Sequence, residues 1–248
     1  MAAGGPEPLT DLSPRRLARI VLRQRWEDVT FLHWAVDPRR VSPFLPSGVR
    51  PDALDGRSYV GLVCFRLVGA AVAPGPAVPW LGTFLETNVR LYSVDGHGRR
   101  GVVFLSMDAS RLAVVLGARV ALGLPYAWAG MSLDRRWPLL TYTTRRRWPG
   151  PGTATSRVVV RVGETISPPT EVDRWLTNRW GLHAGGAYLP NEHDPWPLRG
   201  AELVDLDDRL VAAAGFPDLL ERRPDSVLHS PGVRASFGRA GPYRGARP

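Results

Sequence analysis

Short apolar runs dominate the chain and predict a mainly β protein. Segments rich in β-branched and aromatic residues, bounded by Gly, Pro or Asp, are typical of strands. We predict strands over Val29–Val36, Ser58–Leu67, Thr83–Val94, Gly101–Met107, Leu139–Arg147, Arg157–Glu164 and Leu203–Leu206. Because all-β folds of roughly 200–250 residues are commonly one domain, the 248-residue chain fits a single β-rich domain.

Helical spacing and capping residues appear at fewer places. Ser13-Pro14 predicts the start of a short basic helix that reaches about Arg23, with an apolar stripe of Leu17, Ile20 and Val21. A second helix is predicted from Ser110 to about Leu122, with Asp108 or Ser110 as its cap.

A third helix is predicted to begin at Thr170, because Thr-Glu-Val-Asp has the pattern of a capping box. It would end near Gly181, and its buried side would carry Val172, Trp175, Leu176 and Arg179. Together these elements divide the chain into an arm at 1–25, one domain at 26–222 and a disordered tail rich in Gly, Pro and Arg at 223–248.

The net charge of +9 raises the question of nucleic-acid binding. Residues 1–25 carry five arginines against two acids, and residues 221–248 carry six arginines against two acids. The body between them is nearly balanced, so we expect no nucleic-acid partner. The chain contains no lysine, and all 32 of its basic residues are arginine.

The single cysteine, Cys64, lies in an apolar run and is expected to be a small buried hydrophobe. A lone cysteine forms no internal disulfide, which favours a reducing compartment. The N-terminus has no apolar secretory segment, and no apolar run approaches the roughly 20 residues of a membrane span. We therefore expect a cytoplasmic protein without stable membrane association. The sequence does not decide whether the protein forms a homo-oligomer.

The segment Phe84–Tyr92 carries the most informative pattern. Because side chains alternate along a strand, Leu85, Val89 and Leu91 face one side, and the other side carries Phe84, Glu86, Asn88, Arg90 and Tyr92. A polar face framed by aromatics would line a cavity inside a barrel, where Glu86 and Arg90 would hold each other ionised. The alternative is an exposed strand face with a salt bridge.

Other candidate groups carry weaker signals. Ser106, Asp108 and His33 would make a catalytic triad only if the fold assembled them, and the chain has no Gly-x-Ser-x-Gly motif. His193 is expected to anchor a loop beside Trp196. None of the five histidines is paired at metal-ligand spacing, so no metal or other cofactor is expected.

An ordered series of motifs resembles the YqjF-like family of uncharacterised bacterial proteins over roughly residues 26–200. The motifs are F31-L-H-W34, P46-S-G-V-R-P-D52, D55-G56, F84-L-E-T-N-V-R-L-Y92, G101-V-V-F-L-S-M-D108, A118-R119, L124-P-Y126, L176-T-N-R-W180 and H193-D-P-W-P-L198. One departure is Asn178, where the family tends to carry a glutamate.

The chain is also distantly similar to acetoacetate decarboxylase. Asp37–Ser47 looks like the first helix of that enzyme and its Pro-containing exit, and Glu86 falls where its pocket glutamate lies. The resemblance implies a closed, cone-like antiparallel β-barrel with a few peripheral helices and an internal pocket. The Schiff-base lysine of the enzyme falls on Tyr126, with Ala127 at the neighbouring lysine. A Schiff base needs a primary amine, which no side chain of this sequence supplies.

Two main hypotheses follow for function. The first is a protein whose internal pocket binds a small carboxylate or carbonyl compound through Arg90, Asn88, Arg119, Arg179 and His33. The second is a lysine-independent enzyme of lyase or isomerase type, in which Glu86 acts as acid or base and Tyr126 donates to an oxyanion. A purely structural or partner-binding domain is a further alternative.

Overall fold

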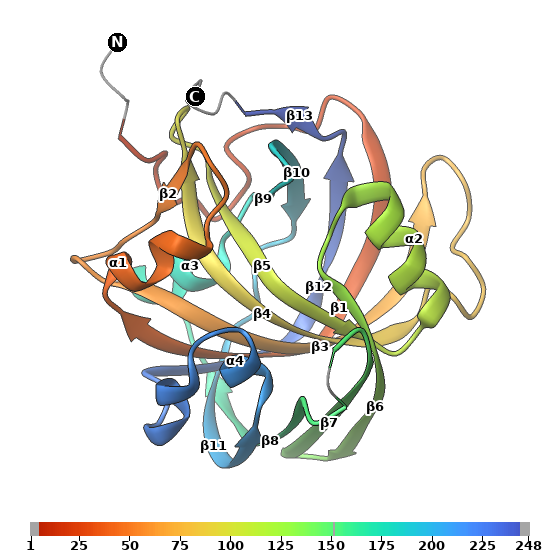
Figure 1. Ribbon diagram of the computed structural model, residues 1–248, viewed down its shortest axis with the longest axis vertical. Helices are drawn as coiled ribbons and strands as arrows, with labels where there is room; N and C mark the ends of the chain where they lie inside the picture. Colours follow the sequence, from red (N-terminus) through yellow and green to blue (C-terminus); the bar gives the residue numbers. More distant parts are fainter. Residues whose placement is uncertain (1–4, 151, 244–248) are drawn as a thin grey trace.

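The computed structural model describes residues 5–150 and 152–243, which form one large sheet with helices at its margins (Figure 1). The strands are β1 (Ile20–Val36), β2 (Val49–Pro51), β3 (Ser58–Val72), β4 (Phe84–Asp95), β5 (Arg100–Ala109), β6 (Tyr126–Arg136), β7 (Leu139–Trp148), β8 (Thr155–Thr165), β9 (Gly181–Ala184), β10 (Ala187–His193), β11 (Arg199–Asp208), β12 (Ser226–Gly238) and β13 (Gly241–Pro242). The α-helices are α1 (Pro38–Val41), α2 (Leu112–Leu122), α3 (Glu171–Thr177) and α4 (Leu210–Ala213), with 3-10 turns η1 (Ser42–Phe44) and η2 (Pro217–Glu221).

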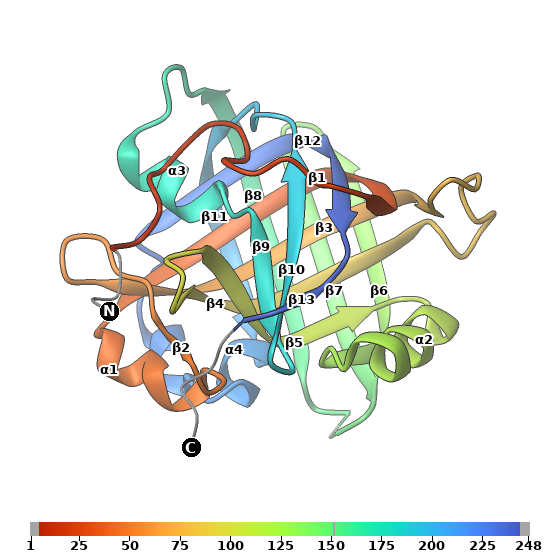
Figure 2. The ribbon, with the colours of Figure 1, turned by 90° about the horizontal axis from the view of Figure 1, so that it is seen from above.

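The sheet curls into a partial ring (Figure 2). Its strand order is β13-β10-β9-β5-β6-β7-β8-β11-β12-β1-β3-β4-β2, and β4 also pairs with β5. All neighbours are antiparallel except β5 with β6 and β5 with β9. Several ladders of the ring are short, because β6 meets β5 only over Tyr126–Trp128, β11 meets β12 only through Arg199 and Gly200, and β9 meets β5 only through Leu182.

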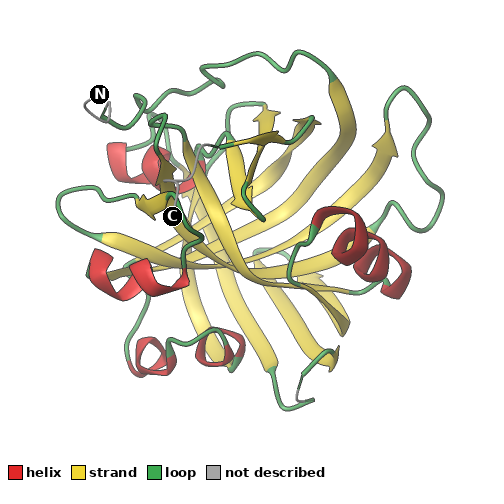
Figure 3. Cartoon of the chain, turned by 45° about the horizontal axis from the view of Figure 1, so that its top comes forward, coloured by secondary structure: helices red, strands yellow, loops and turns green. Residues whose placement is uncertain are grey.

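The predicted mainly β class is confirmed, with short helices outside the strands (Figure 3). Each of the seven predicted strands overlaps an observed strand. The first helix expected from Asp37–Ser47 is also present, as α1 capped by the Asp37 side chain and followed by η1. None of the described helices combines the length and the apolar character that a membrane span requires.

The helix predicted for residues 13–23 is wrong. The chain is irregular up to Arg19, and β1 begins at Ile20. Strand β1 lies between β12 and β3 and is hydrogen-bonded on both sides over most of its length. These ladders satisfy more backbone groups than an isolated short helix would, and such a helix is marginal without tertiary packing.

The disorder predicted for residues 223–248 is wrong for the described part of that segment. Strand β12 pairs with β1 from Ile20↔Gly238 to His33↔Ser226. Leu228, His229 and Ser230 are buried within it. Its Gly- and Pro-rich composition is compatible with a strand because Gly232 has a positive φ, a conformation that glycine adopts readily. Residues 244–248 lie outside the described residues.

Two apolar cores lie on opposite faces of β4, as the alternation predicted. Val89 and Leu91 pack into one core with Trp34 and Leu62. The other core receives Phe84 and Tyr92, together with the aromatic and aliphatic side chains Phe31, Phe65, Met107, Trp175, Leu176 and Leu198. The polar residues of β4 therefore point into the side of the ring that this second core surrounds.

A bulge in β5 overturns the expected role of Asp108. The register with β4 shifts between Val89↔Ser106 and Arg90↔Phe104, so Ser106 and Asp108 face the opposite side of the sheet from Phe104, although simple alternation would place all three on one side. Asp108 is buried and forms a bidentate ion pair with Arg146 of β7, at 2.7 Å. Neither Asp108 nor Ser110 caps α2, which begins at Leu112 without a side-chain cap.

The capping box of α3 is confirmed, because Thr170 and Asp173 each accept from the backbone N–H of the other. The helix ends at Thr177, earlier than predicted. Val172 is exposed and does not lie on the buried side. Trp175 and Leu176 are fully buried, and Arg179 is buried in the segment that follows the helix.

Candidate functional site

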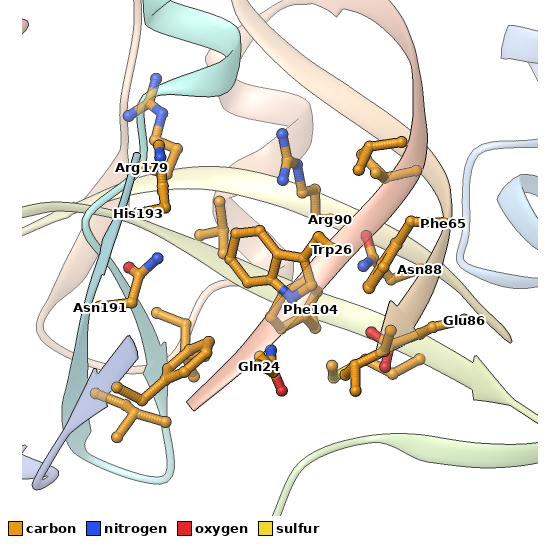
Figure 4. A pocket seen from close by; sticks show the side chains of 18 of the residues that line it. Gln24, Trp26, Phe65, Glu86, Asn88, Arg90, Phe104, Arg179, Asn191 and His193 are labelled. Atoms are coloured by element: carbon orange, nitrogen blue, oxygen red, sulfur yellow. The ribbon is translucent and has the colours of Figure 1, made fainter. Parts of the chain in front are cut away.

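A cavity of about 140 Å³ lies on the side of the ring that β4 lines with polar side chains (Figure 4). Strands β1, β3, β4, β5, β9, β10 and β12 contribute to its wall, together with the segment after α3. Most of the lining is apolar and aromatic. The polar side chains that reach it are Gln24, Glu86, Asn88, Arg90, Tyr126, Thr177, Arg179, Asn191 and His193.

Glu86 and Tyr126 meet at one wall of the cavity. The Tyr126 hydroxyl donates to Oε2 of Glu86 at 3.0 Å, which joins β4 to the first residue of β6. Burial raises the pKa of Glu86 to about 7, and hydrogen bonds from Tyr126 and Asn88 act in the opposite direction. Burial also raises the pKa of Tyr126 well above its ordinary value, so its hydroxyl is a neutral donor.

Asn88 and His193 each present a buried polar atom without a protein partner among the described residues. These atoms are Oδ1 of Asn88 and Nε2 of His193. The two side chains lie on opposite sides of the cavity, with Trp26 and Phe104 between them (Figure 4). His193 stacks on Trp180 with ring centroids 4.3 Å apart.

Arg90 lies between these two walls. Its guanidinium donates to the Tyr92 hydroxyl at 3.1 and 3.2 Å and to the backbone oxygen of Leu176 at 3.0 Å. The expected mutual pairing of Arg90 with Glu86 is wrong, because Arg90 turns towards Tyr92 and Glu86 bonds to Tyr126. Among the described residues, no carboxylate lies within ion-pair distance of Arg90. The positive charge of Arg90 therefore meets only neutral hydrogen-bond acceptors.

Arg179 also reaches the cavity, but unlike Arg90 it is already paired with a carboxylate. Its guanidinium pairs with Asp52 at 2.5 Å and donates to the backbone oxygen of Trp175. Asp52 additionally pairs with Arg100. This buried network fixes the segment after α3 against the strands, which is a structural task.

His33 and Arg119 do not line the cavity. The His33 ring is fully buried behind Arg90, with Nε2 2.6 Å from the Tyr92 hydroxyl. Arg119 lies on α2, where it donates to the backbone oxygen of Tyr126 and covers the Trp148 ring. Both residues support groups that line the cavity. Asn178, the departure from the family pattern, donates to the backbone oxygen of Thr10.

Sequence reasoning missed several lining residues. Trp26 stacks on Trp196, with an interplanar angle of 11°, and both side chains line the cavity. Leu22, Gln24 and Trp26 alternate along β1, so a strand pattern begins at the end of the segment interpreted as a helix and continues beyond it. Asn191 and His193 alternate in the same way on β10, for which no strand was predicted.

The remaining candidate groups lie away from the cavity. Cys64 is 1% exposed in the other core, and burial raises the pKa of its thiol to about 12, which fits the expected small buried hydrophobe. Asp208 is buried near Ser156, and burial raises its pKa to about 6. Within residues 5–150 and 152–243, no three His, Cys, Asp or Glu side chains gather as a metal site would require.

Solved structures of acetoacetate decarboxylase-like proteins share this fold. The acetoacetate decarboxylase-like enzyme from Sphingomonas wittichii RW1 has a TM-score of 0.61 at 15% identity, covering 98% of this chain and 100% of that one. Acetoacetate decarboxylase from Legionella pneumophila has a TM-score of 0.60 at 15% identity, covering 99% and 94%. The enduracididine biosynthesis enzyme MppR complexed with pyruvate has a TM-score of 0.58 at 14% identity, covering 95% of each chain. The protein therefore has an acetoacetate decarboxylase-like fold.

Sequence comparison then places the chain within one family. The profile of DUF2071, a family of uncharacterized conserved proteins, matches residues 23–234. The uncharacterized protein YqjF of Bacillus subtilis (strain 168) is 31% identical over 191 residues, which cover 73% of this chain and 76% of YqjF. The protein belongs to this DUF2071, YqjF-like family.

Proposed function

We propose that the cavity binds a small carboxylate or carbonyl compound without forming a Schiff base. The observation that carries the proposal is Arg90, a guanidinium that reaches an apolar cavity and has no carboxylate partner among the described residues. An arginine in such a place favours a planar anion, because its N–H groups match carboxylate geometry. The buried Glu86–Tyr126 pair supplies a second polar contact nearby.

The size of the cavity limits the ligand. Its volume of about 140 Å³ is close to the ~150 Å³ of an engineered apolar cavity that holds benzene. A carboxylic acid with a short apolar chain fits this space, and a nucleotide or a cofactor of similar size does not. The complex of MppR with pyruvate combines a small oxo acid with a protein of the same fold, which supports this class of ligand. We also infer that the partial ring acts as a closed, cone-like barrel around it.

A thermal-shift screen tests this proposal. The wild type, Arg90→Ala and Arg39→Ala would be heated with small carboxylates and carbonyl compounds of up to about eight carbons. A ligand at 100 times its Kd adds roughly 2.7 kcal/mol to the free energy of unfolding, so its midpoint shift is easily measured. We expect the shift with wild type and Arg39→Ala, whose changed residue is an exposed partner of Asp37, and its loss with Arg90→Ala. A panel without shifts, or a shift kept by Arg90→Ala, contradicts the proposal.

A second candidate function is catalysis at the same cavity. It is favoured by the pKa of Glu86, which at about 7 suits a group that takes and returns protons near neutral pH. In an enolisation, the Glu86 carboxylate would take the proton from the carbon beside a carbonyl, and the Tyr126 hydroxyl would donate a hydrogen bond to the oxygen that becomes negative. This activity would be of isomerase or lyase type.

Exchange in D₂O tests the catalytic candidate. A carbonyl compound that shifts the thermal midpoint should lose the proton beside its carbonyl faster with wild type than in buffer, as followed by NMR. Glu86→Gln should keep the thermal shift and lose the exchange. Exchange at the buffer rate with a bound ligand would exclude enolisation and leave binding as the function.

A further inference from the structure

We propose that the ligand carries a hydrogen-bond donor beside its carboxylate, and that the site selects hydroxy acids over oxo acids of the same carbon skeleton. This inference rests on the proposed function and adds the substrate class. It follows from the kind of polar atom that the cavity leaves without a protein partner.

The free atom of His193 is an acceptor. Its Nδ1 lies 2.8 Å from the backbone oxygen of Asp194. A carbonyl oxygen only accepts, so Nδ1 must carry the proton of that hydrogen bond. Burial, with Arg90 nearby, lowers the pKa of His193 to about 4, so the ring is neutral at physiological pH. Nε2 then carries only a lone pair. This atom is buried without a donor from the described residues, and the His193 side chain lines the cavity.

The free atom of Asn88 is also an acceptor. The Asn88 side chain lies near the Glu86 carboxylate and lowers its pKa, which orients the donor Nδ2 towards Glu86. Oδ1 is therefore the atom left over, and it is buried without a described partner. Asn88 is 3% exposed and lies on the same face of β4 as Arg90, two residues earlier.

Arg90 is thus flanked by two buried acceptors. A carboxylate that meets the Arg90 guanidinium brings the substituent on its neighbouring carbon towards Asn88 or His193. A hydroxyl donates to either acceptor, whereas an oxo oxygen has only lone pairs and faces another lone pair. A buried acceptor that a bound ligand leaves unpaired is costly, and sites built for a hydroxyl strongly reject analogues that lack it.

The test compares matched acids by calorimetric titration of the full-length wild type. The three probes are 2-hydroxy-4-methylpentanoate, 4-methyl-2-oxopentanoate and 4-methylpentanoate, which share one apolar skeleton. We expect the hydroxy acid to bind at least tenfold more tightly than either of the others. Tighter binding of the oxo acid that is lost in Arg90→Ala would overturn this inference and leave the proposed function standing. No binding by any of the three would contradict both.

His193→Phe is the matched variant, because phenylalanine keeps a ring against Trp180 and removes Nε2. The preference for the hydroxy acid should fall by at least tenfold in this variant, because the hydroxyl loses its acceptor. An unaltered preference in both His193→Phe and Asn88→Leu would overturn the inference.

The tautomer can be measured independently of these variants. In ¹⁵N-histidine-labelled wild type at pH 7, the imidazole nitrogen shifts of His193 should report the form protonated at Nδ1. A form protonated at Nε2 would make that atom a donor and would overturn the inference without any ligand.

Discussion

At the residue scale, Glu86 makes stability depend on pH. Burial raises its pKa to about 7 from an ordinary value of 4.5, so the folded protein keeps a proton that the unfolded chain releases. Between these two values the unfolded state binds fewer protons than the folded state. The contribution of Glu86 to the free energy of unfolding therefore falls as the pH rises from about 4.5 to about 7, and it is constant above that.

Replacing Glu86 by glutamine should remove this dependence. We expect Glu86→Gln to gain about 3 kcal/mol relative to wild type between pH 4.5 and pH 8, at about 1.4 kcal/mol per pKa unit. Urea denaturation at several pH values measures the difference. Asp208→Asn is the control, because the pKa of Asp208 is raised to about 6 and its gain should be complete near that pH. A wild-type to Glu86→Gln difference that stays constant across this range would contradict the prediction.

The sequence predicted the position of single side chains only where the local geometry of a strand determines which face they lie on. Alternation along one strand placed Glu86, Asn88 and Arg90 on a common face, and the cavity lies on that face. Their partners were beyond reach, because Tyr92, Leu176 and Tyr126 approach through the packing of separate elements. His193 was interpreted as a loop anchor, since nothing local indicates that β10 carries it to the cavity.

At the element scale, nonlocal pairing overrode local signals in β1 and β12. A Ser-Pro start favours a helix, and a Gly- and Pro-rich composition favours disorder. Instead, the backbone N–H and C=O groups of β1 form hydrogen bonds with those of β12. The bulge in β5 is a similar case, because a single additional residue in this strand places Asp108 on the face opposite to Phe104.

Two glycines should respond oppositely to alanine. Gly232 in β12 has a φ of 135°, and a Cβ there would collide with the backbone oxygen of Trp26. We expect Gly232→Ala to destabilise the protein by more than about 1 kcal/mol. Gly117 lies in α2 with open space around it, so Gly117→Ala should stabilise by roughly 0.5–1 kcal/mol. Thermal denaturation of both variants checks this pair, and changes of the same sign would refute it.

At the scale of the whole molecule, the resemblance indicated the fold class before the structure did. The apolar runs predicted the mainly β class, the ordered series of motifs over residues 26–200 implied the acetoacetate decarboxylase-like fold, and the family match extends to residue 234. Sequence reasoning did not show that β12 joins β1, because no motif in that resemblance lies beyond residue 200.

Truncation tests how much the stability of the fold depends on the pairing of β12 with β1. A chain ending at Arg223 loses β12 and leaves one side of β1 unpaired, so we expect loss of cooperative unfolding and of the near-UV circular dichroism signal. A chain ending at Gly238 keeps every pair between β1 and β12 and should retain both. Equal behaviour of the two truncations would mean that β12 adds little to the fold.

The pairing of β1 with β12 also bears on how the protein is made. Residues 20–36 leave the ribosome well before their partner at 226–238. Throughout synthesis β1 can pair with β3 but must expose the backbone groups of its other side. Contacts so distant in sequence also form slowly. The nascent chain therefore cannot complete its sheet until residues 226–238 have emerged, and until then it presents a strand to which other chains can add.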